Sequence, residues 1–167
     1  MILTHALSVQ QPWARALLVQ GPRRKPLENR YNVRAIDRPP FPVPSGWLGL
    51  HAGLAIHGAE ARCLGLCPEA AEPPIYERGA LIGAVHVVGW VRASEALRDP
   101  LLAPWVMQPT QDELDAERER RRAKGDHRPI AREGWCLVTD AARTIPPIRM
   151  RGMLGRFALA EEVVIDV

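Results

Sequence analysis

The chain has 167 residues, of which 47% are hydrophobic and 25% are charged. That length suits one domain, and the apolar fraction is large enough for a core, so a mainly disordered chain is excluded. The formal net charge of +3 and the pI of about 9.1 permit a polyanionic partner without requiring one. The longest apolar run, Ala80 to Val91, is shorter than the roughly 20 residues of a membrane-spanning helix, and the first residues do not form a secretory signal. We therefore expect a cytoplasmic protein that contacts no membrane.

The first predicted elements are a short helix and an extended stretch. The helix lies within residues 8–20, with Ser8 or a nearby polar residue as its cap and Pro12 in its first turn. Residues 27–33 are expected to be extended. The prolines of residues 38–46 exclude a helix interior and a central strand, so a surface loop is predicted there. The helix is expected to pack one face on a core, through Trp13, Ala14, Leu17 and Leu18.

The middle of the chain contains the clearest strand. Residues 47–51 are typical of a buried strand, and the small and apolar residues 56–66 are compatible with a helix. Residues 80–91 form a long run rich in β-branched side chains after a glycine. This run predicts a strand at the centre of a sheet.

The last third of the chain combines one charged helix with several strands. Residues 110–113 form a capping box before a helix of residues 114–124, which is so charged that it has almost no apolar stripe. Strands are predicted at residues 135–139, 155–159 and 163–167. Short strands with two or three helices between them predict an α+β fold or a partly closed barrel, and they give little support to parallel βαβ alternation.

Three cysteines do not form a disulfide framework, because their number is odd. Cys63 and Cys67 are spaced by one helical turn, and a zinc site would need further ligands from His51, His57 and Cys136. No second paired motif appears, and free cysteines usually serve as small buried apolar residues. We therefore expect no metal site.

Standard catalytic signatures are absent from the sequence. It has no phosphate-binding P-loop, no dinucleotide-binding glycine motif, no nucleophile elbow and no His-Glu-x-x-His motif, so we expect no cofactor. Polar side chains are instead concentrated in the first thirty residues. They are Ser8, Gln10, Gln11, Lys25, Glu28, Asn29 and Arg30.

These residues lie in two segments that resemble the opening of the ASCH domain, Leu-Ser-x-x-Gln-Pro-Trp-Ala followed by Gly-x-Lys-x-x-Glu-x-Arg. The matching segments are residues 7–14 and 25–30. The similarity continues in residues 46–52, 79–83 and 152–159. The resemblance therefore brackets nearly all of a single domain, residues 1–167, and leaves a charged helical insertion at about 99–133.

The resemblance implies an α+β fold built on a small PUA-like β-barrel that is decorated by two to four helices. It also implies that RNA or single-stranded DNA binds in a basic cleft. We expect Lys25, Arg30 and Arg34 to contact phosphates, and Ser8, Gln10 and Glu28 to read one nucleotide by hydrogen bonds. Base stacking on Trp13 is a further contact of this kind.

Family members with enzymatic activity imply an alternative in the same cleft. One branch removes the acetyl group from N4-acetylcytidine with a Lys, a Thr and a Glu, and another member cleaves RNA. This chain keeps Lys25 but has Glu28 at the position of the threonine, which removes the hydroxyl nucleophile. An amidohydrolase acting on a modified nucleoside, or a metal-independent ribonuclease, would use Lys25, Glu28 and His51 as catalytic residues.

Each candidate also has a purely structural interpretation. Glu28 with Arg30 or Ser8 would form an ion-pair network that locks the barrel. Trp13 would pack in the core, and His51 would be a hydrogen-bonded group at a strand end.

The charged helix of residues 114–124 has three interpretations. Its charges pair within the helix, it extends a nucleic-acid surface, or it binds a protein partner, in which case the chain acts as an adaptor.

Overall fold

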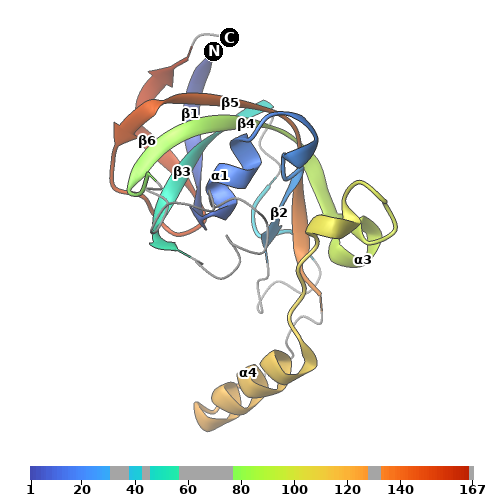
Figure 1. The fold of residues 1–167 in the computed structure, drawn as a ribbon. Coiled ribbons are helices and arrows are strands. Elements are labelled where there is room, and N and C mark those ends of the chain that lie inside the picture. The colour runs from blue at the N-terminus through green and yellow to red at the C-terminus, as the bar shows by residue number, and fades with distance from the viewer. Residues whose placement is uncertain (31–37, 43–45, 57–76, 128–132, 166–167) are drawn as a thin grey trace, which may run out of the picture. The chain divides into compact units, whose positions relative to one another are not determined.

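The structure is a computed structural model that describes residues 1–30, 38–42, 46–56, 77–127 and 133–165. Its strands form one six-stranded sheet in the order β2-β5-β4-β3-β1-β6 (Figure 1). The strands are β1 (Ile2–Gln11), β2 (Leu27–Arg30), β3 (Gly46–Ile56), β4 (Ala80–Arg92), β5 (Trp135–Arg149) and β6 (Arg156–Val164). The helices are α1 (Trp13–Leu18), α3 (Ala93–Ala96) and α4 (Gln111–Ala123), with 3₁₀ turns at Gly21–Arg23 and Ala103–Trp105.

These elements confirm the α+β class and the decoration of the sheet by helices. The strand order is open, with β2 and β6 at its two ends, so the described strands do not close into a barrel. Among the residues that the structure describes, no helix is long and apolar enough to cross a membrane.

Several predicted elements are confirmed. The strand at residues 47–51 is the first half of β3, and residues 80–91 form β4, which lies inside the strand order. Helix α4 begins after Thr110, whose side chain and that of Glu113 form the predicted capping box. The helix predicted at residues 56–66 lies outside the described residues beyond Ile56, which ends β3.

Other predictions were wrong in their boundaries. Ser8 does not cap a helix, because β1 continues to Gln11 and α1 has only six residues, with Pro12 at its N-cap. β1 pairs with β3 on one side and β6 on the other, so its backbone groups are satisfied by two ladders. The β1–β3 pair is parallel, an arrangement that the sequence pattern did not suggest. One strand, β6, also replaces the two predicted after residue 155.

The contacts within the chain divide it into two compact units. Unit 1 comprises Met1–Lys25, Pro44–Val88 and Thr139–Val167, and unit 2 comprises Pro26–Val43 and Gly89–Val138.

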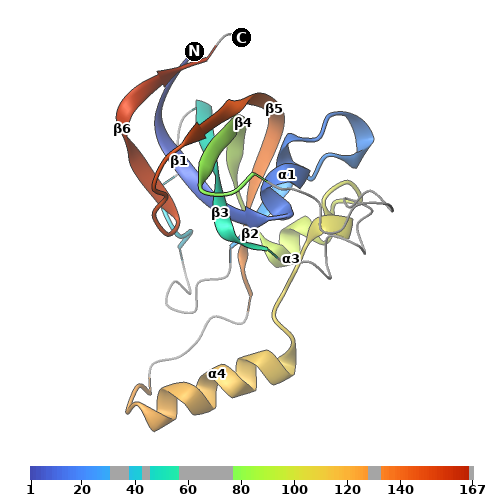
Figure 2. The ribbon, with the colours of Figure 1, turned by 60° about the vertical axis from the view of Figure 1, so that its left-hand side comes forward.

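In unit 1, the two faces of the sheet are covered by different elements. Helix α1 packs on β1 and β3, as Figures 1 and 2 show. A Cβ added at Gly83 of β4 would lie 2.7 Å from the side chain of Leu18, so α1 covers the face to which Gly83 belongs. The next residue, Ala84, points to the opposite face and shares a core cluster with Ala6 of β1. Ser8 follows Ala6 by two positions and therefore lies on that opposite face.

The core cluster on this second face is built from both ends and the middle of the chain. β1 contributes Leu3 and Ala6, β4 contributes Leu81 and Ala84, and the C-terminal part contributes Phe157 and Ile165. Since these residues are far apart in sequence, the face forms only when the strands have assembled.

Unit 2 has its own small core, and the polar residue Asn29 joins two of its segments. Leu27, Ala93, Ala96 and Cys136 form the cluster. The side-chain amide of Asn29 donates to the Trp105 carbonyl at 2.8 Å, and its oxygen accepts from the Met107 amide at 2.9 Å. Asn29 therefore fastens the segment before α4 to strand β2.

Candidate functional site

Lys25 and Trp13, both taken from the N-terminal motif, contact each other in unit 1. The Lys25 ammonium lies 4.6 Å from the centroid of the Trp13 ring, and only 1% of Lys25 is exposed. The chain reverses between them at the 3₁₀ turn Gly21–Arg23, and the Lys25 amide donates to the Ala16 carbonyl at 2.9 Å. Trp13 itself is only partly buried.

The stretch around Trp13 presents polar groups to solvent. Gln10, at the end of β1, and Arg15, on α1, are both exposed. Gln11 is buried and structural, because its oxygen accepts from the Arg15 amide at 3.1 Å and its NH2 group donates to the Glu77 carbonyl at 2.8 Å. The sequence motif did not single out Arg15, although its place between the buried Ala14 and Ala16 indicates the outer side of the helix.

Arg24, the neighbour of Lys25 in the basic run Arg23-Arg24-Lys25, has a structural role. Its guanidinium donates to the Thr139 hydroxyl at 3.0 Å and to the Thr139 carbonyl at 2.7 Å. A basic run that looks like a surface patch in the sequence thus holds one half-buried arginine and one buried lysine.

Ser8 and His51 form a hydrogen-bonded pair on the face of unit 1 opposite α1. The Ser8 hydroxyl and His51 Nδ1 are 3.0 Å apart, and His51 Nε2 is 3.3 Å from the Met150 carbonyl. A carbonyl only accepts, so Nε2 carries a proton. Burial lowers the pKa of His51 below its ordinary value of 6.5, which favours the neutral imidazole, and Nδ1 of the neutral ring accepts from the Ser8 hydroxyl.

The His51 ring is enclosed by the segment that joins β5 and β6. Phe157 contacts it edge-on, with ring centroids 5.8 Å apart. A Cβ added at Gly152 would lie 2.1 Å from a ring atom, so only glycine fits against the imidazole. Only 3% of His51 is exposed, and both of its ring nitrogens are hydrogen-bonded. The buried ring is therefore a packing partner of this segment.

Glu28 and Arg30 belong to strand β2 in unit 2. Glu28 is buried, and its carboxylate lies 3.5 Å from Nε of the half-buried Arg30. The predicted ion pair between these two residues is therefore present. Arg34 lies outside the described residues.

Metal ligands do not gather in the described part of the chain, where no group of three or more His, Cys, Asp and Glu side chains is suitably placed. Cys136 is buried, and its thiol is 3.6 Å from the Asn29 oxygen. Cys63, Cys67 and His57 lie outside the described residues.

Of the comparisons with known proteins, the one with solved structures gives matches. No protein-family model matches the chain. No curated protein matches it either. Among solved structures, the crystal structure of ASCH from Zymomonas mobilis is similar, with a TM-score of 0.50 and 12% identity over 94% of this chain and 87% of that one. A mutant of the same Zymomonas mobilis protein gives a TM-score of 0.49 and 12% identity, over 94% of this chain and 90% of that one. The chain therefore has the fold of an ASCH domain, which confirms at the level of fold the resemblance seen in its sequence.

Proposed function

We propose that the chain binds single-stranded nucleic acid, RNA or DNA, at the N-terminal end of α1. The observation that carries the proposal is the set of side chains in residues 10–15, in which Gln10 and Arg15 are exposed and Trp13 is partly exposed. An indole face stacks on any base, an amide bonds to base edges, and a guanidinium pairs with phosphate. The resemblance of residues 7–14 and 25–30 to ASCH domains implies the same class of partner, RNA or single-stranded DNA.

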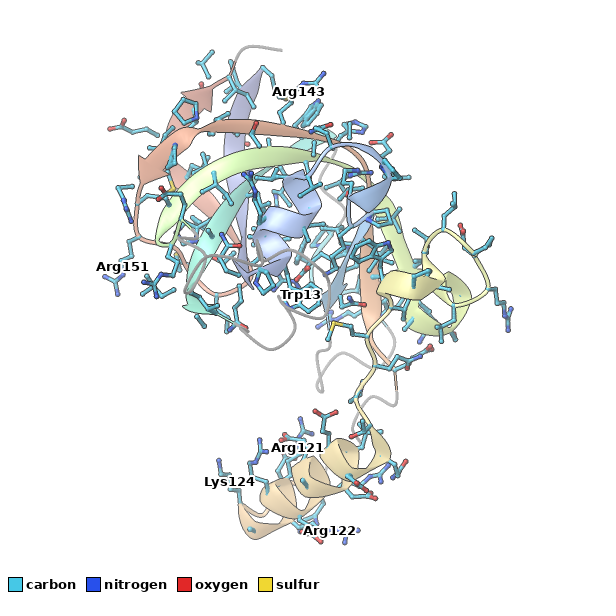
Figure 3. The ribbon with its side chains drawn as sticks, in the orientation of Figure 1. Trp13, Arg121, Arg122, Lys124, Arg143 and Arg151 are labelled. Carbon is cyan, nitrogen blue, oxygen red and sulfur yellow. The ribbon has the colours of Figure 1, made fainter. Side chains whose placement is uncertain are left out.

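Lys25 acts in this site as a positioning residue. Its ammonium is buried against the Trp13 ring, so it fixes the indole by a cation–π contact of about 0.5–2 kcal/mol. Direct contact with phosphate falls to Arg15, which solvent reaches. Figure 3 shows Trp13 at the end of α1 at which this arrangement lies.

The enzymatic alternatives receive less support from the described residues. Lys25, Glu28 and His51 are all buried, and both ring nitrogens of His51 are engaged in hydrogen bonds. A nucleic-acid-binding module accounts for the exposed side chains without requiring any of these three to reach a substrate.

The test is fluorescence anisotropy with short labelled single-stranded RNA and DNA, at low salt and over a salt series. Trp13→Leu should weaken binding by the value of one base stack, about 1–3 kcal/mol. Arg15→Gln should reduce the slope of log affinity against log salt by about 0.7, the value for one phosphate contact on a single strand. Arg143→Gln is the control, because Arg143 is an exposed arginine of unit 1 that lies over Trp47 instead.

Circular dichroism of each variant separates loss of binding from loss of fold, and a duplex of the same sequence tests the need for unpaired bases. Wild-type protein that binds neither RNA nor DNA would refute the proposal. Equal loss of affinity in Arg143→Gln and Arg15→Gln would refute the site.

A further inference from the structure

A second group of exposed arginines lies in unit 1, at the same end of the sheet as Trp13. Arg78 precedes β4, Arg149 ends β5, and Arg151 lies in the β5–β6 loop, residues 150–155. β1, which leads into α1, runs parallel to β3 and antiparallel to β6, so its C-terminal end lies where β6 begins. Figure 3 shows Trp13 and Arg151 toward the lower side of this unit and Arg143 at its top.

Hydrogen bonds through residues 77–79 connect the start of α1 to this arginine group. The Gln11 side chain donates to the Glu77 carbonyl at 2.8 Å. On the other side, the Arg149 guanidinium donates to the Arg78 carbonyl at 2.7 Å, and the Met150 amide donates to the Gly79 carbonyl at 3.2 Å. Residues 77–79 therefore bridge the Trp13 site and the β5–β6 loop.

The bridge carries a surplus of positive charge. Arg149 is 3.5 Å from the Glu77 carboxylate, and the two side chains are 75% and 44% exposed. An ion pair so open to water is weak, and the bond from Arg149 to a carbonyl leaves its charge in place. Within the described residues 77–79 and 149–151, three arginines, Arg78, Arg149 and Arg151, outnumber the one carboxylate, Glu77, and so attract an anion.

Apolar side chains stand beside these charges. Met153 is 64% exposed and Leu154 is 100% exposed, within the loop Gly152-Met153-Leu154-Gly155. The loop is held from beneath, because the Ser8 amide donates to the Gly155 carbonyl at 3.0 Å and His51 bonds to Met150. Its two apolar side chains are thus presented to solvent on a fixed backbone.

We infer that a nucleic-acid strand bound at Trp13 continues across residues 77–79 onto the β5–β6 loop. There Arg149 and Arg151 contact phosphates, and Met153 and Leu154 pack against bases. This inference rests on the proposed function and extends it from one nucleotide to a track of several. A single strand fits this combination because its bases are free to meet apolar side chains while its backbone meets the arginines.

The experiment is an oligonucleotide length series, from about 3 to about 16 nucleotides, which spans the range of sites that single-stranded binding folds occupy. Wild-type affinity should rise with length. Arg149→Gln/Arg151→Gln should bind the shortest oligonucleotide as the wild type does, yet bind the longest about tenfold more weakly than the wild type. Leu154→Ser should likewise reduce the gain in affinity that comes with a longer oligonucleotide. The control is Arg122→Gln/Lys124→Gln, which removes two exposed cations at the C-terminal end of α4.

The outcomes separate the inference from the function on which it rests. If the affinity of Arg149→Gln/Arg151→Gln rises with oligonucleotide length as much as that of the wild type, the track is overturned and the Trp13 site still stands. A wild type that binds no oligonucleotide would remove both. An acidic peptide that competes as well as an RNA of equal charge would overturn nucleic acid as the occupant.

Discussion

Two arginine-rich regions of this protein differ in what surrounds their charges. Within α4, five acidic residues accompany four arginines. Arg118 pairs with Asp115, and Arg120 and Arg121 both pair with Glu117, at 2.6 Å and 3.1 Å. The helix is therefore close to neutral despite its arginines, which Figure 3 shows along it.

The sheet end of unit 1 has fewer arginines and more available charge. Arg149 donates to a main-chain carbonyl and lies 3.5 Å from the Glu77 carboxylate. Arg78 and Arg151 are exposed beside it. The comparison shows that an arginine-rich stretch of sequence indicates a binding surface only when its acidic neighbours, in sequence and in space, have been counted.

The two regions also differ in the range of their interactions. α4 depends on local contacts, from its capping box to its ion pairs three and four residues apart. The sheet end depends on contacts between distant strands, such as Ser8 with Gly155 and His51 with Met150. Substitutions should therefore separate the regions, with the larger effects at the sheet end.

The largest effect on stability is expected for Gly152→Ala. The new Cβ would lie 2.1 Å from the His51 ring, so the loop must move, and overpacking of this kind costs about 1–3 kcal/mol. Chemical denaturation should show this loss, and the affinity for long oligonucleotides should fall with it. Gly89→Ala is the matched control, because nothing lies within 4 Å of its added Cβ. Equal stability of the two variants would show that the loop does not pack on His51.

A moderate effect is expected when His51 is titrated. Burial lowers its pKa in the folded protein below 6.5, so the unfolded state binds more protons between the two values. The contribution of neutral His51 to stability should therefore be complete above about pH 6.5 and be lost as the pH falls through the folded-state pKa. Urea unfolding at several pH values, compared with His51→Gln, isolates this contribution. The same pH dependence in both proteins would contradict the assigned neutral state.

The smallest effect is expected for Thr110→Ala in α4. The Thr110 hydroxyl accepts from the Glu113 amide at 3.2 Å, and loss of such a cap costs about 1 kcal/mol. Hydrogen exchange of the first amides of α4 should become faster, and Thr110→Ser should restore protection. Affinity for nucleic acid should not change. If it fell, α4 would be part of the binding surface.

The sequence predicted the parts of the molecule that local physics determines. The capping box at Thr110 and the β-branched run of residues 80–91 each select one secondary structure within a few residues. The resemblance to ASCH domains supplied the fold class, which the solved structures support.

Side-chain placement was beyond the sequence because it depends on pairing between strands. The parallel register of β1 and β3 brings Ser8 opposite His51, and no local pattern encodes that register. Lys25 was expected at a surface cleft, yet its ammonium is buried against Trp13 after a chain reversal. Arg149 and Arg151 belong to the basic stretch from Arg143 to Arg156, and nothing in that stretch indicates its closeness to the start of α1.

The most direct test of the account is the salt dependence of binding to a long single-stranded oligonucleotide. We predict that Arg149→Gln/Arg151→Gln lowers the slope of log affinity against log salt by about 1.4, which corresponds to two phosphate contacts on a single strand. Arg122→Gln/Lys124→Gln should leave the slope at the wild-type value. A reduced slope in the α4 variant with an unchanged slope in the sheet-end variant would contradict the account and move the binding surface to α4.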